Sequence, residues 1–589
     1  MTGSSPGKPA ASAARLAKRA ATWALWSLAL AYVAFFVLAS VRLQTNDDVF
    51  VYFTYARNFC DGRFFAYDPR NLPSEGFTSL AYLLALVPFQ CLGANMMFAA
   101  FLLLFCACVA TVLVAALAVQ RLGRPADGIG PVFAVLFALL LGLDPNVRGL
   151  VGWPFESLLS PPCLALLILA LGRALDRPEA RAPLAWFVAL TFLGYLARPE
   201  NLLLFAPLGL VLFLLHPKRG RVLWAAGLLA AGCGLFLLGK QLVFHDIFPT
   251  GYYRKMGVAG AGSSYVRAAL AEYASWLWLA AVGLGAYAVA TVAAVRRAAD
   301  PDQRRRLLRE PAVVAALVAV AVLNLLVVRR VTPLVGIYFR YLVTAIVALA
   351  FVLALLGARL MMATLSRRVP RPVLAALLLV GVVSVLRAQP GDRDLVGGGI
   401  TRLYADARTQ AEGHLYLKFG RYLRAHLSDP SAVTLVMGDS GAVPYAAGCR
   451  FIDSNGLTEP ALARLFGEQP DKVRRYLAHL RRFHPDVVVL WYGSPKLDGV
   501  LPLGWNAHSP LSPEEWLRVS RELRDGGFGY LGTIHAYYDL HLGLDRNSPH
   551  FDELRRVLGE YVREDGYLLP AGLGLRVGSE EVRFAPLGQ

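Results

Sequence analysis

Asn46, Asp47 and Asp48 follow directly after an apolar run of about twenty residues, which is long enough to cross a bilayer. Two carboxylates at a boundary between water and lipid are costly unless they are solvated, paired or functional. One interpretation is structural, with Asn46 and Asp47 capping a helix over 49–59. The alternative is a site, because paired carboxylates can bind polar groups or accept protons.

The residues around the two aspartates favour a site over a simple helix cap. Segment 46–82 is dense in aromatic and charged side chains, and it contains the turn dipeptides Asp61-Gly62 and Asp68-Pro69. Tyr55, Arg57 and Glu75 are the members of this segment that we expect to bind a polar substrate. The segment therefore predicts a folded loop that carries chemistry.

Ionisable residues also recur at the edges of later apolar runs. Such positions indicate function by default, because burial in hydrocarbon is costly unless the charge is paired or lines a cavity. Arginine in particular suits phosphate through its planar fork of donors. The alternative, that a cation merely snorkels to ordinary lipid phosphates, is the better interpretation for the pair Arg329 and Arg330. The candidates are the cations Arg198, Lys240, Arg254, Lys255 and Arg340 and the acids Glu156 and Glu200.

Composition places the chain among polytopic helical membrane proteins. Of its 589 residues, 56% are apolar and only 17% are charged, and apolar runs of span length recur along it. The net charge of +18 could indicate nucleic-acid binding. Much of the excess lies in short loops between apolar runs, where the positive-inside rule predicts it, so we expect a lipid bilayer and no nucleic acid as partner.

The same charge rule orders the chain across the membrane. Residues 1–20 form a cytoplasmic tail, residues 21–388 form the transmembrane domain, and its first outer loop is 44–93, in which 78–90 lies along the surface as a helix. An odd number of spans places residues 389–589 on the same outer side as Asp47 and Asp48. The eleven predicted spans are 21–43, 94–119, 129–143, 157–175, 183–197, 200–216, 221–243, 272–295, 311–329, 340–359 and 372–388.

After residue 389 the composition changes to that of an extracytoplasmic α/β domain. We expect a linker near 395–399, an amphipathic helix over 404–426, strands at 433–437 and 487–491, and a helix over 472–484. The aromatic residues of this domain could stack on sugar rings or belong to its core, and we expect the domain to position a glycan acceptor. These aromatic residues are Trp491, Tyr492, Trp505, Tyr537 and Tyr538.

The cysteines and histidines predict no metal site. The seven cysteines contain no CxxC spacing and lie mostly in apolar runs, so neither a disulfide framework nor a zinc site is expected. The histidines of the C-terminal domain likewise lack the spacing of metal ligands. They are His414, His484, His535, His541 and His550.

Several motifs taken together resemble one enzyme family. They are Asp47-Asp48, Tyr55-Ala56-Arg57-Asn58, Asp61-Gly62, Glu75-Gly76-Phe77-Thr78-Ser79, Glu156, Arg198-Pro199-Glu200, the stretch from His245 to Lys255, Arg340-Tyr341, and the segments 438–445 and 453–458. The pattern resembles the terminal arabinofuranosyltransferase of mycobacterial cell-wall synthesis and its wider bacterial relatives, which include a flagellar motor control protein. The chain departs from that pattern at Trp153-Pro154-Phe155, before Glu156, so the sugar pocket could be shaped differently.

The resemblance implies a glycosyltransferase of the GT-C fold in cell-envelope biogenesis. Such an enzyme moves a sugar, with arabinofuranose as the leading candidate, from a polyprenyl-phosphate donor to a glycan or other envelope acceptor, and inverts the anomeric centre. Asp47 or Asp48 would then be the general base. The five candidate cations would bind the donor phosphate, and Glu156, Tyr55, Arg57, Glu75 and Glu200 would bind sugar or acceptor. Paired acids could hold a divalent metal, but the cations make one unnecessary, so no cofactor is expected.

Two other classes of protein compete with this hypothesis. A transporter also has buried charges around a cavity, but the chain contains no convincing internal repeat. A non-catalytic regulatory protein of the envelope or flagellar motor would not require both aspartates. The sequence thus predicts a multi-pass enzyme of the inner (plasma) membrane, with a cytoplasmic N-terminus and an extracytoplasmic C-terminal domain.

Overall fold

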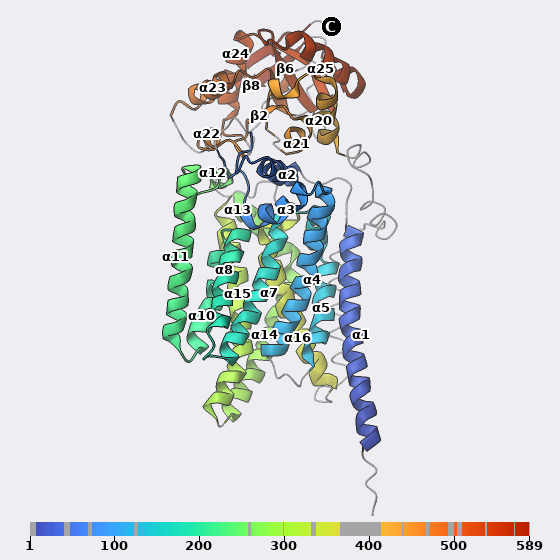
Figure 1. The fold of residues 1–589 in the computed structure, drawn as a ribbon, viewed down its shortest axis with the longest axis vertical. Coiled ribbons are helices and arrows are strands. Elements are labelled where there is room, and N and C mark those ends of the chain that lie inside the picture. The colour runs from blue at the N-terminus through green and yellow to red at the C-terminus, as the bar shows by residue number, and fades with distance from the viewer. Residues whose placement is uncertain are drawn as a thin grey trace, which may run out of the picture.

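The computed structural model describes residues 8–40, 47–68, 73–122, 128–256, 261–298, 300–331, 337–365, 414–438, 441–466, 470–492, 500–502, 509–535, 539–569 and 572–587. Within these ranges the chain forms a bundle of long helices with an α/β domain on one end (Figure 1). We call this the domain end of the bundle and the opposite end the far end. The predicted linker near 395–399 and the predicted span 372–388 lie outside the described residues.

The helices of the bundle coincide with the predicted spans from 21 to 359. Apolar runs form helices because a helix satisfies its backbone hydrogen bonds within the segment, as a bilayer requires. The bundle helices are α1 Lys8–Ser40, α4 Met96–Leu122, α5 Ile129–Leu143, α6 Pro145–Gly152, α7 Ser160–Asp176, α8 Ala182–Ala197, α9 Asn201–Leu204, α10 Ala206–Leu215, α11 Arg219–Phe244, α14 Ala274–Arg297, α15 Pro301–Arg329 and α16 Val343–Leu365.

Fewer of these helices are long enough to span a membrane than the sequence predicts. Within the described residues seven helices meet the requirements of length and apolarity, or eight if the bent pair α5 and α6 counts as one span. The predicted spans at 183–197 and 200–216 form shorter helices, because α8 has only 16 residues and Phe205 separates α9 from α10. The chain is nevertheless a multi-pass membrane protein with a C-terminal α/β domain.

The first loop forms two helices between the bundle and the C-terminal domain (Figure 1). They are α2 Asp47–Cys60 and α3 Leu80–Cys91, and α3 confirms that 78–90 is largely helical. One sequence-based prediction is wrong here, because Cys60 and Cys91 form a disulfide that joins the ends of these helices. No CxxC motif signals this bond. Only the packing of α2 against α3 brings the two thiols together.

The C-terminal domain is built around a mixed six-stranded sheet with the strand order β2-β1-β3-β6-β5-β7. β1 pairs in parallel with β2 and β3, whereas β6 pairs antiparallel with β3 and β5. The strands are β1 Thr434–Met437, β2 Arg450–Asp453, β3 Val487–Tyr492, β5 Phe528–His535, β6 Asp539–Asp545 and β7 Gly566–Tyr567, with a second sheet of β4 Val500–Pro502, β8 Leu573–Val577 and β9 Glu580–Phe584. The predicted strands at 433–437 and 487–491 are thus confirmed.

Helices cover both faces of this sheet. Alternate residues of a strand point to opposite faces, so Leu435 and Met437 belong to one core and Val436 to another. α23 and α24 contribute to the core that contains Val436, and α20, α21 and α25 to the other. Their bounds are α20 Leu415–His426, α21 Ala442–Ala447, α22 Pro460–Ala463, α23 Lys472–Phe483, α24 Pro513–Asp525 and α25 Phe551–Asp565.

The first loop and the C-terminal domain share one hydrophobic core. Residues of α2, α3 and the start of α4 belong to the same buried cluster as residues of α20, α21, α25 and the sheet. Polar contacts reinforce this joint: the Asp68 carboxylate accepts a hydrogen bond from the backbone N–H of Phe451 on the edge strand β2, at 3.0 Å. Residues separated by more than 300 positions therefore fold as one body above the helices.

Candidate active site

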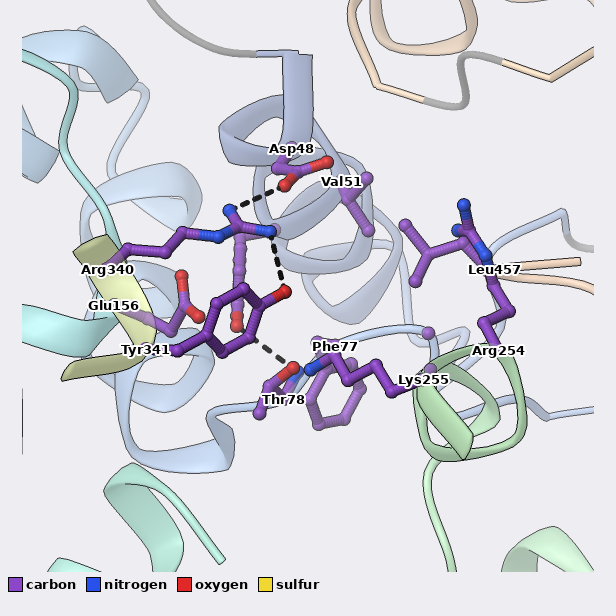
Figure 2. A pocket seen from close by; sticks show the side chains of 13 residues that line it. Asp48, Val51, Phe77, Thr78, Glu156, Arg254, Lys255, Arg340, Tyr341 and Leu457 are labelled. Carbon is purple, nitrogen blue, oxygen red and sulfur yellow. Dashed lines mark hydrogen bonds and ion pairs between the residues drawn. The ribbon is translucent and has the colours of Figure 1, made fainter. Parts of the chain in front are cut away.

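A polar cleft lies between the helix bundle and the C-terminal domain (Figure 2). It encloses about 610 Å³, part of which is open to solvent. Three cations and two carboxylates line it, so its charged lining carries a surplus positive charge. The full lining is Asp48, Val51, Tyr52, Gly76, Phe77, Thr78, Glu156, Gly251, Arg254, Lys255, Arg340, Tyr341 and Leu457.

Short elements at the ends of the long helices bring these residues together. They are the first turn of α2, the segment after Gly76, the 3-10 helix η2 Glu156–Leu159, α12 Thr250–Met256, and the 3-10 helix η3 Ile337–Leu342. In η3 the backbone of Tyr338 and Phe339 adopts positive φ angles of 51° and 46°. This reversal directs Arg340 and Tyr341 into the cleft instead of along a regular helix (Figure 2).

Two tyrosines of α2 hold the next part of the loop in place. The Tyr52 hydroxyl accepts hydrogen bonds from the backbone N–H groups of Thr78 and Ser79, at 3.2 and 3.1 Å. The Tyr55 hydroxyl accepts one from the backbone N–H of Gly76, at 3.0 Å. Tyr55 is fully buried and does not line the cleft, so the structure places this predicted sugar-binding residue behind the site.

An ion pair links the first loop to η3. Arg340 donates a hydrogen bond from Nη1 to Asp48 Oδ2, at 2.8 Å, and Figure 2 shows the two side chains facing each other. Arg340 also donates from Nη2 to the Tyr341 hydroxyl, at 3.2 Å. The Asp48 side chain keeps 31% of its surface exposed, whereas Arg340 keeps 9%. The carboxylate is therefore the accessible partner.

Tyr341 is surrounded by positive charge. Lys255 Nζ lies 5.2 Å from the centre of its ring, and the guanidinium groups of Arg340 and Arg198 lie at 5.1 and 5.6 Å. Three cations around one aromatic ring interact favourably with its π-electrons, but they repel one another. The cleft lining itself carries the three cations Arg254, Lys255 and Arg340 against the two acids Asp48 and Glu156, and this surplus favours an anion.

Arg198 lies behind the cleft, where two carboxylates neutralise it. Its Nε donates to Glu200 Oε1 at 2.6 Å, and its Nη1 lies 3.5 Å from Glu156 Oε1. Burial alone would lower the pKa of Arg198, but Glu200 and Glu156 outweigh this effect and raise the pKa above its ordinary value. Arg198 thus stays charged and orients Glu156, which lines the cleft.

Lys240 and Glu75 form a second buried pair beside the cleft. Lys240 Nζ lies 2.6 Å from Glu75 Oε2, and both side chains are at most 10% exposed. Burial raises the pKa of Glu75 to about 7, and Lys240 opposes this rise. Neither residue lines the cleft. Their pairing instead fixes the end of α11 to the first loop.

The two adjacent aspartates have different surroundings. Both Asp47 carboxylate oxygens accept hydrogen bonds from backbone N–H groups of the C-terminal domain, from Gly441 at 2.8 Å and Ala442 at 2.7 Å. These amides begin α21, so Asp47 caps a helix from another part of the chain. Arg57 has a similar role, because its Nη1 donates to the Tyr445 carbonyl at 2.8 Å. Only Asp48 of the pair lines the cleft.

The structure brings together five of the predicted site residues, namely Asp48, Glu156, Arg254, Lys255 and Arg340. Sequence analysis missed the central position of Tyr341, although the motif Arg340-Tyr341 names it. It also missed Leu457, which comes from the C-terminal domain. Leu457 lies in segment 453–458, which belongs to the motif pattern, but nothing local marks this leucine as a residue of a cleft.

Among the described residues no group of three or more His, Cys, Asp and Glu side chains could hold a metal ion. The expectation that no metal is required remains a prediction. The predicted C-terminal aromatics Trp505, Tyr537 and Tyr538 lie outside the described residues.

Comparisons with known proteins give one family and several distant structures. The family, a domain of unknown function (DUF8728), matches residues 401–538, which is less than half of the chain. No curated protein matches the chain significantly. ArnT from Cupriavidus metallidurans bound to undecaprenyl phosphate is 12% identical, with 91% of this chain and 99% of that chain covered and a TM-score of 0.49.

A second solved structure is the Archaeoglobus fulgidus oligosaccharyltransferase tethered with an acceptor peptide that contains the NVT sequon. It is 11% identical, with 87% of this chain and 74% of that chain covered and a TM-score of 0.46. Both TM-scores lie below 0.5, so these likenesses are distant.

Proposed function

We propose that this protein is a membrane glycosyltransferase that moves a sugar from a polyprenyl-phosphate donor to an acceptor hydroxyl. The observation that carries the proposal is the cleft in which Asp48 contacts Arg340, beside Arg254 and Lys255. A carboxylate next to a surplus of cations, at the end of a bundle of membrane helices, suits a reaction that needs a base and releases a lipid phosphate.

Asp48 is the general base in this mechanism. The acceptor hydroxyl attacks the anomeric carbon, its proton passes to the Asp48 carboxylate, and the bond between that carbon and the phosphate oxygen breaks. Attack from the face opposite the leaving phosphate inverts the anomeric centre. Glu156, oriented by Arg198, accepts hydrogen bonds from sugar hydroxyls. The hydrogen bonds that both Asp47 oxygens accept from Gly441 and Ala442 support Asp48 over Asp47 as the base.

Arg340 couples the two ends of the reaction. As Asp48 takes up a proton it loses its negative charge, while the leaving phosphate gains one. The guanidinium of Arg340 contacts Asp48 in the resting site, and it lies over the same Tyr341 ring as Lys255. Arg340 can therefore release the neutralised Asp48 carboxyl and bind the phosphate as negative charge develops on it. Arg254 and Lys255 bind the phosphate together with Arg340.

The sequence resemblance supports arabinofuranose as the donor sugar and a glycan of the cell envelope as the acceptor. The disulfide between Cys60 and Cys91 supports an outer location for the cleft, because such bonds persist in oxidising compartments. Arginines cluster at the far end of the bundle, as expected for the cytoplasmic side. We therefore place the protein in the inner (plasma) membrane with the C-terminal domain outside.

The test is transfer of labelled sugar from synthetic polyprenyl-phosphate-arabinofuranose to an octyl arabinofuranoside by the purified protein. We expect Asp48→Asn to lower the rate by about 10²- to 10⁴-fold, the usual contribution of a general base. Asp47→Asn should retain more activity, because Asp47 acts only through the C-terminal domain. Full activity in a folded Asp48→Asn variant would overturn the mechanism.

A further inference from the structure

One wall of the cleft comes from the C-terminal domain. Leu457 is half-buried and lines the cleft, together with residues of the first loop, η2, α12 and η3. In Figure 2 its side chain points toward the other residues that line the cleft. A leucine that a separate domain extends into a polar cleft is the feature that the proposed function leaves unexplained.

The loop that carries Leu457 is rigid. The buried Asp453 carboxylate accepts hydrogen bonds from the backbone N–H groups of Asn455, at 3.0 Å, and Thr458, at 2.7 Å. The Asn455 side chain donates to the Gly438 carbonyl at 2.9 Å. Leu457 lies between these anchored positions, so its backbone is held beside the cleft.

The same loop is also attached to the membrane domain. The Leu457 carbonyl accepts a hydrogen bond from the Thr250 hydroxyl, and Thr250 begins the helix that carries Arg254 and Lys255. A side chain at Gly76 has no room here, because its Cβ would lie 2.8 Å from Thr458 Cγ2 and 2.9 Å from the Leu457 carbonyl oxygen. The loop, the first-loop segment and α12 thus form one packed unit.

The geometry points to Leu457 as a specificity-determining residue that contacts the acceptor. This inference rests on the proposed function. In this inference the lipid-linked donor binds at the cations, which lie on elements of the membrane domain, and the acceptor binds beside Leu457, which comes from the C-terminal domain. An apolar side chain there, on the same cleft as Asp48, packs against the apolar face of a sugar ring and aligns its hydroxyl with the base. The acceptor class is therefore a glycoside with an exposed apolar ring face.

The experiment measures KM for both substrates, with synthetic polyprenyl-phosphate-arabinofuranose as donor and an octyl arabinofuranoside as acceptor. We expect Leu457→Ala to raise the acceptor KM about tenfold, equivalent to about 1.4 kcal/mol. The donor KM should stay near that of the wild type, and so should the slow release of polyprenyl phosphate without acceptor. Leu457→Met, which conserves volume, should restore the acceptor KM.

Leu569→Ala is the matched control, because Leu569 is a half-buried leucine of the same domain that does not line the cleft. A second variant, Leu457→Phe, narrows the cleft and should reduce transfer to a disaccharide acceptor more than to a monosaccharide. An unchanged acceptor KM in Leu457→Ala, or an equal rise in both KM values, would overturn the role of Leu457 alone. A wild-type protein that consumes no polyprenyl-phosphate sugar would overturn the proposed function together with it.

Discussion

Ion pairs form at both ends of the helix bundle, but their surroundings differ. At the far end Asp176 pairs with Arg121 and Arg309, at 2.9 and 2.6 Å, and these side chains are 20% to 35% exposed. At the domain end Arg198 and Arg340 are 5% and 9% exposed. The distances are alike, so distance alone cannot separate a structural pair from a functional one.

The ion pairs at the domain end differ from those at the far end in two ways: their side chains are more buried, and they converge on one cleft. Partly exposed pairs such as Asp176 with Arg121 contribute at most about 1 kcal/mol each, because water screens them. Buried pairs cost desolvation that the attraction often does not offset, so they persist where they serve a purpose. Those at the domain end converge on one cleft with a surplus cation. An ion pair therefore indicates a site when it is desolvated and borders a cavity that lacks charge balance.

The largest expected effect comes from removing one arginine at the domain end of the bundle and comparing the result with the loss of one at the far end. Arg340→Gln removes the cation that contacts Asp48, and we expect sugar transfer to fall by about 10²- to 10³-fold. The matched variant Arg121→Gln, at the far end, should change transfer by about twofold or less. Initial rates of both purified variants provide the measurement. Similar losses in both would mean that arginine pairs matter for folding at either end.

The disulfide offers a second way to separate the ends. Cys60 and Cys91 lie 31 residues apart at the domain end, and closing a loop of that length stabilises a fold by about 4 kcal/mol in the chain-entropy model. The double variant Cys60→Ser with Cys91→Ser should lower the midpoint of thermal unfolding in detergent. Cys106→Ser, which changes an exposed free cysteine of α4, is the control and should leave the midpoint unchanged. An unchanged midpoint of thermal unfolding in the double variant would mean that the disulfide does not stabilise the fold.

A smaller effect distinguishes the neighbouring aspartates. Asp47→Asn leaves one acceptor oxygen where the carboxylate offers two to Gly441 and Ala442. The loss of a charged hydrogen bond should cost about 1 to 2 kcal/mol of unfolding free energy, whereas Asp48→Asn should cost less because its amide oxygen can still accept the hydrogen bond from Arg340. Thermal unfolding of Asp47→Asn and Asp48→Asn measures the stability that each substitution costs. If Asp48→Asn were the less stable, the division of roles between the two residues would fail.

The smallest expected effect concerns pH and the loop that carries Leu457. Burial raises the pKa of Asp453 from 3.8 to about 6, although Arg254 opposes the rise. Between pH 4 and 6 the folded protein retains a proton that the unfolded chain has lost, so stability falls as the pH rises through this range. Asp453→Asn keeps an acceptor oxygen but cannot titrate. The unfolding temperature of this variant should therefore fall less than that of the wild type as the pH rises from 4 to 6. The difference in unfolding free energy should grow by about 1 kcal/mol for each pH unit within this range. Parallel pH profiles of the two proteins would contradict the burial of a titrating carboxyl.

Sequence patterns were sufficient for much of the fold. Apolar runs and arginine-rich connections determine where helices begin and end, because each helix satisfies its own backbone hydrogen bonds. Short, largely apolar and β-branched runs at 433–437 and 487–491 likewise predict strands that are covered on both faces. The sequence also placed Asp48, Arg254, Lys255 and Arg340 among the candidates, since charges at the edges of apolar runs are rare and costly.

Only the tertiary structure decided which of these residues line the cleft and which have a structural role. Asp47 and Asp48 are adjacent and chemically identical, yet one caps α21 and the other borders the cleft, because consecutive residues of a helix point in different directions. The partner of Asp48 lies 292 residues away. The contribution of Leu457 depends on how a separate domain packs against the bundle. Local sequence fixes the type of each element, but contacts between distant segments depend on packing that no local pattern encodes.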